Sequence, residues 1–347
     1  MKVSRKKVAV ALSGGIDSAV TAMLLKEEGY EVVGITGKMT PQDNSAVENA
    51  KKVADKLEIP HYALDVSKKF EEKVIKYFEN AYRSGNTPNP CIMCNKYIKW
   101  GELFDYAVNE LSADFIATGH YANIKQDGEF YKLYPASDEH KDQLYFLYQL
   151  DQEKLAKTLL PLSKYKKSEV KELANKYDLP PKSSKESQDI CFIKAPMTTK
   201  KYLNNIFEAQ KGDFVEKSTG KVLGHHEGFW QYTIGQRKGI GLAAPEALYV
   251  VGIEPNTNTV YVGYKNELFK DKLILKNINW SYPNNDKEFE ALVKIRYNMN
   301  SVRANVIKTE IGWEIVFSEP VSGITPGQAC VLYSIEDGHL LGGEIIE

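Results

Sequence analysis

The residues best suited to chemistry form one short stretch, Ala11-Leu12-Ser13-Gly14-Gly15-Ile16-Asp17-Ser18. An apolar run precedes it, and an amphipathic segment that stops at Gly29 follows it, which predicts strand, tight turn and helix. Two adjacent glycines let backbone N–H groups gather at the positive end of that helix, so the expected ligand is an oxyanion. Asp17 and Ser18 fall in the first helical turn, where a carboxylate can hold Mg²⁺ and a hydroxyl can contact phosphate. Because the stretch lacks the lysine of a Walker P-loop, γ-phosphate transfer is disfavoured.

Cysteines give the second chemical signal. Cys91 and Cys94 follow the extended Pro88-Asn89-Pro90 at a predicted helix start, where a lowered pKa favours the reactive thiolate. A zinc half-site or two buried small residues are the alternatives, although no second CxxC exists. Cys191 lies in a polar loop, and Cys330 falls within a predicted strand and is expected in the core.

Composition indicates a multidomain protein without a membrane segment. The chain has 347 residues with a net charge of −1, and no apolar run approaches membrane-spanning length, so we expect a cytoplasmic protein. Between Lys154 and Lys201, twelve lysines, among them Lys166 and Lys167, face only five acidic residues. This segment predicts a patch that binds a phosphate backbone, with a solvated helical face as the alternative.

Strands and helices alternate in the first part of the chain. We expect strands at Glu31–Thr36, Pro60–Asp65 and Asp114–Thr118, and this alternation predicts an α/β fold with a parallel sheet. Gly37 and the run Gly119-His120-Tyr121 stand at carboxyl ends of strands, where such sheets bind nucleotides. After residue 212 short β runs and turns predominate, and from about residue 272 six candidate strands predict a small barrel or sandwich.

Seven motifs occur in one order along nearly the whole chain: SGGIDS, TPNPCIMCNKYIKWG, ATGHYA, KDQLYFL, KESQDICFI, YTIGQRKG and TPGQA. Together they resemble the bacterial tRNA-specific 2-thiouridylase family (MnmA). The resemblance implies a PP-loop ATP-pyrophosphatase domain (residues 1–204), a small central β-rich domain (205–268) and a C-terminal β-barrel (269–347). It also implies ATP- and Mg²⁺-dependent 2-thiolation of the wobble uridine of tRNAs for Lys, Glu and Gln. In that reaction uracil O2 is adenylated, and sulfur from a cysteine desulfurase or a sulfur-relay protein displaces AMP.

The resemblance also assigns roles to residues. Cys191 would carry a persulfide, and Cys94 would attack it or close a disulfide with it. ATP would be bound by Ala11, Leu12, Ser13, Gly14, Gly15, Ile16, Asp17, Ser18, Gly37 and Gly119. The target base would be contacted by Asn89, Pro90 and Cys91, and the rest of the tRNA by His120, Lys141, Asp142, Gln143, Tyr297, Asn298 and Gln328. Arg296 and Arg303 are further basic residues suited to RNA.

One position departs from the common family pattern. Many members have an aspartate, proposed as an acid/base, where this chain has Cys91, and a thiol cannot simply take that role. Related thiolases hold a [4Fe–4S] cluster with three cysteines, so Cys91, Cys94 and Cys191 leave the persulfide and cluster routes both open. Another pyrophosphate-loop ligase and a non-catalytic tRNA-binding protein are the rival functions.

Overall fold

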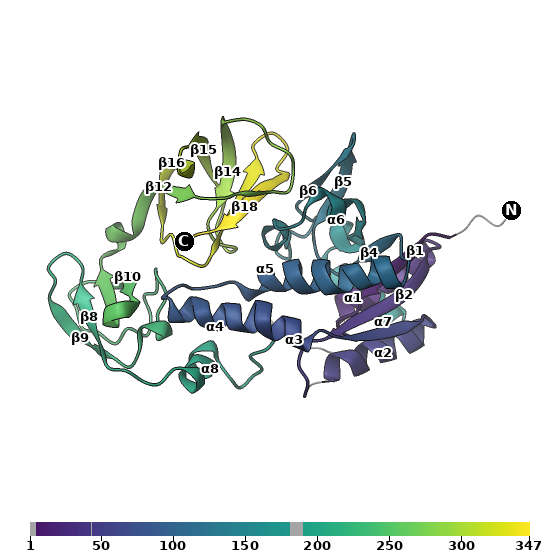
Figure 1. Ribbon diagram of the computed structural model, residues 1–347, viewed down its shortest axis with the longest axis horizontal. Coiled ribbons are helices and arrows are strands. Elements are labelled where there is room, and N and C mark those ends of the chain that lie inside the picture. Colours follow the sequence, from purple (N-terminus) through teal and green to yellow (C-terminus); the bar gives the residue numbers. More distant parts are fainter. Residues whose placement is uncertain (1–4, 43, 181–189) are drawn as a thin grey trace.

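The computed structural model describes residues 5–42, 44–180 and 190–347. Figure 1 shows three parts: an α/β domain that contains the N-terminus, a small central β domain, and a C-terminal β domain packed above the long helices that join the other two. In the part of the chain that the structure describes, no helix is both long enough and apolar enough to cross a membrane.

A five-stranded parallel sheet forms the centre of the first domain, as the sequence predicts. Its order is β3-β2-β1-β4-β7, and all neighbouring strands run in the same direction. The strands are β1 (Lys7–Ala11), β2 (Glu31–Lys38), β3 (His61–Asp65), β4 (Phe115–Ala117) and β7 (Thr158–Leu159). Because β1 and β4 are neighbours, their carboxyl ends bring residues 11–18 and 118–121 to the same edge of the sheet.

Helices cover both faces of this sheet. One layer consists of α1 (Ile16–Glu27), α2 (Ser45–Leu57) and α7 (Lys167–Lys176), whose apolar residues share a core with alternate residues of β1. On the other face lie α3 (Ser67–Phe70), η1 (Glu71–Ile75), α4 (Lys76–Arg83), α5 (Pro90–Cys94), η2 (Asn95–Leu103) and η3 (Tyr106–Glu110). Smaller elements are β5 (Asn123–Asp127), β6 (Phe130–Tyr134), η4 (Leu144–Leu147), α6 (Gln152–Ala156) and η5 (Pro161–Lys164).

The helical segments 67–83 and 90–110 lie side by side and point toward the other two domains (Figure 1). The turn between them contacts both. A Cβ on Gly85 would lie 2.7 Å from Pro255 Cγ of the central domain, and the Thr87 N–H donates to Pro326 O of the C-terminal domain at 2.8 Å. The Asn89-Pro90-Cys91 segment therefore begins where the three domains meet.

The central domain contains a four-stranded sheet of order β10-β11-β8-β9. Its elements are β8 (Gly212–Glu216), β9 (Val222–His226), η6 (Phe229–Gln231), β10 (Tyr249–Glu254), η7 (Pro255–Thr257), β11 (Thr259–Gly263) and η8 (Lys265–Leu268). Helix α8 (Thr199–Ile206) spans the predicted domain boundary at 204/205, and its Leu203 packs into the core of this domain.

The C-terminal domain is one antiparallel sheet of seven strands with edge strands β12 and β13. The strands are β12 (Phe269–Leu275), β13 (Asn279–Trp280), β14 (Glu288–Lys294), β15 (Val302–Thr309), β16 (Gly312–Ser322), β17 (Ala329–Ser334) and β18 (Leu340–Ile345). Cys330 is buried in β17, as predicted. Ala329 and Val331 share a core with Tyr145 of the first domain, so the two domains pack as one unit.

Candidate active site

The SGGIDS stretch forms the predicted strand, turn and helix, and its own hydroxyls close the turn. The Ser18 hydroxyl donates to Gly15 O at 3.0 Å and accepts from the Ser13 N–H at 3.1 Å. Gly14 has φ +75°, and a Cβ there would lie 2.7 Å from Asn49 Cβ, so glycine is required at this position. The first N–H groups of α1 have no partner within the helix itself, so the start of α1 at this turn is suited to an anion.

Gly119 brings the end of β4 into contact with this loop. A Cβ on Gly119 would lie 2.9 Å from the Asp17 carbonyl carbon and 2.9 Å from Ser18 N. Only a residue without a side chain allows this approach, so Gly119 lies directly against the SGGIDS loop. Gly37 is the last residue but one of β2, so it lies near the carboxyl end of this strand, and a Cβ there would meet Val66 Cγ2 at 2.9 Å, so its small size also serves packing.

Lys167 is the main correction to the sequence interpretation. Its ammonium group lies 2.6 Å and 2.7 Å from the two carboxylate oxygens of Asp17, and the Tyr121 hydroxyl donates to the same carboxylate at 2.9 Å. Lys167 is only 9% exposed, so it cannot be part of a solvated surface patch. Sequence reasoning placed it among the tRNA-binding lysines because its local composition is basic, whereas α7 packs on α1 and brings it to the SGGIDS loop.

The three predicted chemical cysteines lie in one region of the protein. The thiols of Cys91, Cys94 and Cys191 lie within electrostatic range of Lys99, and each lies within that range of at least one other thiol. All three are free thiols in this structure, so the Cys94–Cys191 disulfide is not formed.

Thiol acidity differs from expectation. Burial raises the pKa of the Cys94 thiol to about 12, and Lys99 opposes this effect. Cys91 and Cys191 retain exposed surface, yet the packing around their sulfur atoms raises their pKa as well. Cys94 is the fifth residue of the helical segment that begins at Pro90, and burial of its thiol outweighs the predicted helix-terminus effect. A neighbouring cation is therefore needed to stabilise a Cys94 thiolate.

Lys99, whose charge acts on the thiols, contacts His120. The Lys99 ammonium group lies 3.1 Å from His120 Nε2, and Thr118 Oγ1 lies 2.8 Å from His120 Nδ1. Burial, with a further contribution from Lys99, lowers the pKa of His120 well below its ordinary value, so the imidazole is neutral. The neutral ring then accepts from Lys99 at Nε2 and donates from Nδ1 to Thr118. His120 was predicted to contact tRNA; here it is buried and both ring nitrogens have protein partners.

A cluster of iron and sulfur does not fit this arrangement. Among residues 5–42, 44–180 and 190–347, no group of three cysteine, histidine or acidic side chains is placed to hold a metal ion. Burial raises the pKa of all three thiols, and although Lys99 acts in the opposite direction, the net effect favours thiols over the thiolates that a cluster requires. For Mg²⁺, Asp17 offers one carboxylate, which matches the few protein ligands that this ion uses when phosphates bind beside it.

Several residues predicted to contact tRNA also connect parts of the protein. The Asp142 carboxylate accepts from the Ala136 N–H at 3.0 Å, and the Gln143 side chain accepts from the Tyr121 N–H at 3.1 Å. The Tyr297 hydroxyl donates to Asp142 O at 2.9 Å. These contacts order the loop that contains Lys141, which is partly exposed.

Two further residues of the tRNA set lie in the C-terminal domain. Gln328 donates to Thr87 O at 2.7 Å, next to the Asn89-Pro90-Cys91 segment. Asn298 is exposed. Within that segment the Asn89 side chain accepts from the Cys91 N–H at 3.2 Å and caps α5, and Pro90 is buried as its first residue. The Arg296 guanidinium group donates to the carbonyl oxygen of Gly323 at 2.8 Å, so it connects two segments of the C-terminal domain.

The exposed part of the basic segment remains a candidate tRNA surface. Lys164 and Lys166 are exposed, whereas Lys182 and Lys185 lie outside the described residues. We expect Lys164→Glu with Lys166→Glu to weaken tRNA binding and to reduce the slope of log K against log salt by about two, because each lysine that contacts a phosphate releases about one counterion. Filter binding at several salt concentrations measures this slope.

A matched control separates the patch from net charge. Lys52→Glu with Lys68→Glu changes the charge of the protein by the same amount at exposed positions of other helices. An equal loss of slope in this control would contradict a specific role for the patch.

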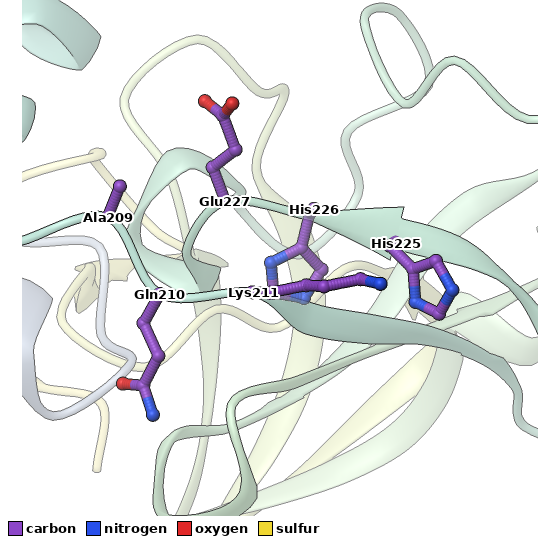
Figure 2. Close-up of a pocket in the computed structure, with 6 residues that line it drawn as sticks. All are labelled: Ala209, Gln210, Lys211, His225, His226 and Glu227. Atoms are coloured by element: carbon purple, nitrogen blue, oxygen red, sulfur yellow. The ribbon is translucent and has the colours of Figure 1, made fainter.

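A separate pocket lies in the central domain, lined by Ala209, Gln210, Lys211, His225, His226 and Glu227 (Figure 2). The His225 imidazole pairs with Asp213 at 2.7 Å, and His226 Nδ1 accepts from the Gly228 N–H at 3.0 Å. The two histidines therefore have separate protein partners. The pocket belongs to the central domain, whereas the ATP loop and the thiols belong to the first domain.

A parallel α/β domain with a glycine-rich loop at the carboxyl end of β1 defines a nucleotide-binding protein. Three family models cover the chain: a tRNA methyl transferase HUP domain over residues 6–195, a tRNA methyl transferase PRC-barrel domain over 200–264, and an aminomethyltransferase beta-barrel domain over 270–346. These descriptions agree with the α/β, central β and C-terminal β architecture seen here.

Curated relatives match along their whole length. The tRNA-specific 2-thiouridylase MnmA of Carboxydothermus hydrogenoformans is 44% identical over 99% of this chain and 98% of its own. That of Clostridium botulinum strain Alaska E43 is 42% identical over 100% of this chain and 99% of its own. A solved 4-thiouridine synthetase–RNA complex with bound ATP is 20% identical, covers 54% of this chain and 44% of its own, and has a TM-score of 0.35. The chain belongs to the tRNA-specific 2-thiouridylase (MnmA) family, as its motifs predict.

Proposed function

We propose that this protein is an ATP-dependent tRNA sulfurtransferase that makes 2-thiouridine at the wobble position of tRNAs for Lys, Glu and Gln. Membership of the family supports synthesis of 2-thiouridine in tRNA with ATP. One structural observation carries the mechanism: Gly119 packs against the ATP loop, while the next residue, His120, contacts Lys99, whose charge acts on the three thiols. Nucleotide activation and sulfur chemistry are therefore joined by two consecutive residues.

The first step activates the base. Uracil O2 attacks the α-phosphorus of ATP, the α–β phosphoanhydride bond breaks, and pyrophosphate leaves. The N–H groups at the start of α1 stabilise the charge on the departing phosphates. Adenylation turns a poor leaving group, a carbonyl oxygen, into a good one.

The second step delivers sulfur. We propose that Cys191 receives a persulfide from a cysteine desulfurase or relay protein. The terminal sulfur of the persulfide attacks C2 of the base, and AMP leaves with the former O2 oxygen. The Cys94 thiolate then attacks Cys191 Sγ, which breaks the S–S bond to the base and yields 2-thiouridine and a Cys94–Cys191 disulfide. A thiol reductant supplies the two electrons that restore both thiols.

Lys99 should control the rate of the sulfur step. The pKa of Cys94 is raised to about 12, so the thiolate fraction, and with it the rate, should rise between pH 6 and pH 9. Lys99→Met removes the cation that lowers this pKa and should slow sulfur transfer about tenfold or more at each pH. Single-turnover thiolation of pre-adenylated tRNA measures the effect. A Lys96→Met variant is the control in the same helix, and a Lys99→Met rate equal to wild type would contradict the role of Lys99.

Mass spectrometry of tRNA nucleosides tests the proposed function. Purified protein, ATP, Mg²⁺ and a persulfide donor should produce 2-thiouridine at the wobble position of the three tRNAs, and none without ATP. Formation of 4-thiouridine, or of no thiolated nucleoside, would contradict the proposal. We place the reaction in the cytoplasm, where mature tRNA is available.

A further inference from the structure

The ATP loop lacks a cation in its own sequence. Its N–H groups carry only partial positive charge, whereas a triphosphate carries several negative charges. A loop of this kind that activates an α-phosphate would benefit from a full positive charge close to the first turn of the helix. No lysine or arginine occurs between Val8 and Lys26.

Lys167 places an ammonium group at this point. Its Nζ lies 2.6 Å and 2.7 Å from the Asp17 carboxylate oxygens, in the first turn of α1. The Asp17 side chain remains 34% exposed and that of Lys167 11% exposed, so the pair lies at the edge of the loop and not deep in the core. Asp17 therefore holds the lysine at the start of α1, the end of the helix that carries partial positive charge.

Three contacts fix the position of this lysine. Its backbone N–H donates to Asp138 at 2.8 Å, its ammonium group lies 5.9 Å from the centre of the Tyr121 ring, and α7 packs on α1 through Val170 and Ala174. A buried ion pair is weak support for stability, because apolar replacements of such pairs are often neutral or stabilising. A lysine held this firmly at an anion loop is better explained by a ligand.

We propose that Lys167 is the phosphate-binding cation of the ATP site, delivered from α7 to a loop that has none. The inference rests on the proposed function, since it assumes that the loop binds ATP. When ATP binds, the ammonium group contacts the polyphosphate while Asp17 and Tyr121 hold its side chain. Lys167 then stabilises the negative charge that develops as the pyrophosphate leaves.

Chemical labelling of the wild-type protein tests whether Lys167 lies beside the phosphates of bound ATP, without the need for a variant. An acyl-phosphate derivative of ATP transfers its acyl group to a lysine amine beside the bound phosphates. Peptide mass spectrometry should find the label on Lys167, protected by excess ATP, and not on its exposed neighbour Lys166. Label on other lysines with none on Lys167 would overturn the proposal.

Kinetics of two variants test the role. Lys167→Gln should reduce kcat/KM for ATP in tRNA-dependent AMP formation by about 100-fold or more, and Lys167→Arg should restore part of it. The tRNA affinity and its salt slope should stay within about twofold of wild type, as should all ATP parameters of the control Lys52→Gln, at an exposed lysine of α2. If Lys167→Gln instead keeps wild-type ATP kinetics, or loses tRNA affinity with a smaller salt slope, the inference is wrong. Wild-type protein that makes no 2-thiouridine would contradict the proposed function itself, whereas these outcomes concern Lys167 alone.

Discussion

Cys94→Ser and Cys191→Ser should each lower 2-thiouridine formation by at least about 100-fold while tRNA-dependent pyrophosphate release persists in the first turnover. The reason is that the thiols serve the sulfur step, and a hydroxyl neither carries a persulfide nor attacks one. Among the described residues, no hydrogen bond joins the SGGIDS loop to the side chain of Cys94 or Cys191. Activation of the base should therefore continue in both variants. Quench-flow measurement of pyrophosphate alongside nucleoside analysis separates the two steps.

Cys91 is the matched control among the three thiols. It interacts with both other cysteines but has no assigned bond-making role in the persulfide route, so Cys91→Ser should keep activity within about threefold. Anaerobically prepared protein should also be active without iron. Loss of activity in Cys91→Ser together with about four bound iron atoms in the wild type would contradict this account and favour the cluster.

Asp17→Ala should abolish both AMP formation and thiolation, with a loss of at least about 100-fold, while tRNA binding changes little. The substitution removes the carboxylate that Lys167 and Tyr121 bind, so the ammonium group loses the partner that places it at the loop. Ser13→Ala should act in the same direction because the Ser13 hydroxyl lies 3.2 Å from that of Ser18 in the turn. Steady-state AMP release and filter binding measure the two effects.

Asp55→Ala provides the control for loss of an acidic residue in an ion pair. Asp55 pairs with Lys51 on the surface of α2, away from the loop, and such pairs contribute at most about 1 kcal/mol. This variant should retain wild-type kinetics. An Asp17→Ala protein that thiolates tRNA at the wild-type rate would rule out this loop as the ATP site.

Local signals predicted the loop and its surroundings well. The strand, turn and helix around residues 7–27 depend on near neighbours: β-branched residues, two glycines and an amphipathic segment. The alternation of strands and helices predicted the parallel sheet. The place of Cys330 within a predicted strand indicated that its side chain is buried in the core. The family was predicted from ordered motifs and is confirmed by its relatives.

Long-range contacts set the remaining features. Lys167 is 150 residues from Asp17 in the sequence, so its basic surroundings suggested tRNA and nothing local indicated the ATP loop. Tyr121 lies in the ATGHYA motif and Lys99 in the TPNPCIMCNKYIKWG motif. Their place in these motifs was the sequence signal that could have identified them as site residues. The raised pKa of Cys94 depends on how the helices and the loop around Cys191 pack, which a helix-terminus argument does not include.

Oxygen-18 transfer tests the central claim most directly. A tRNA transcript with ¹⁸O at O2 of the wobble uridine is incubated with the protein, ATP, Mg²⁺ and a persulfide donor, and the products are analysed by mass spectrometry. Adenylation of O2 followed by displacement predicts one ¹⁸O atom in the phosphate of AMP for each 2-thiouridine formed. Label in inorganic phosphate or in water, with unlabelled AMP, would contradict activation of the base by adenylation.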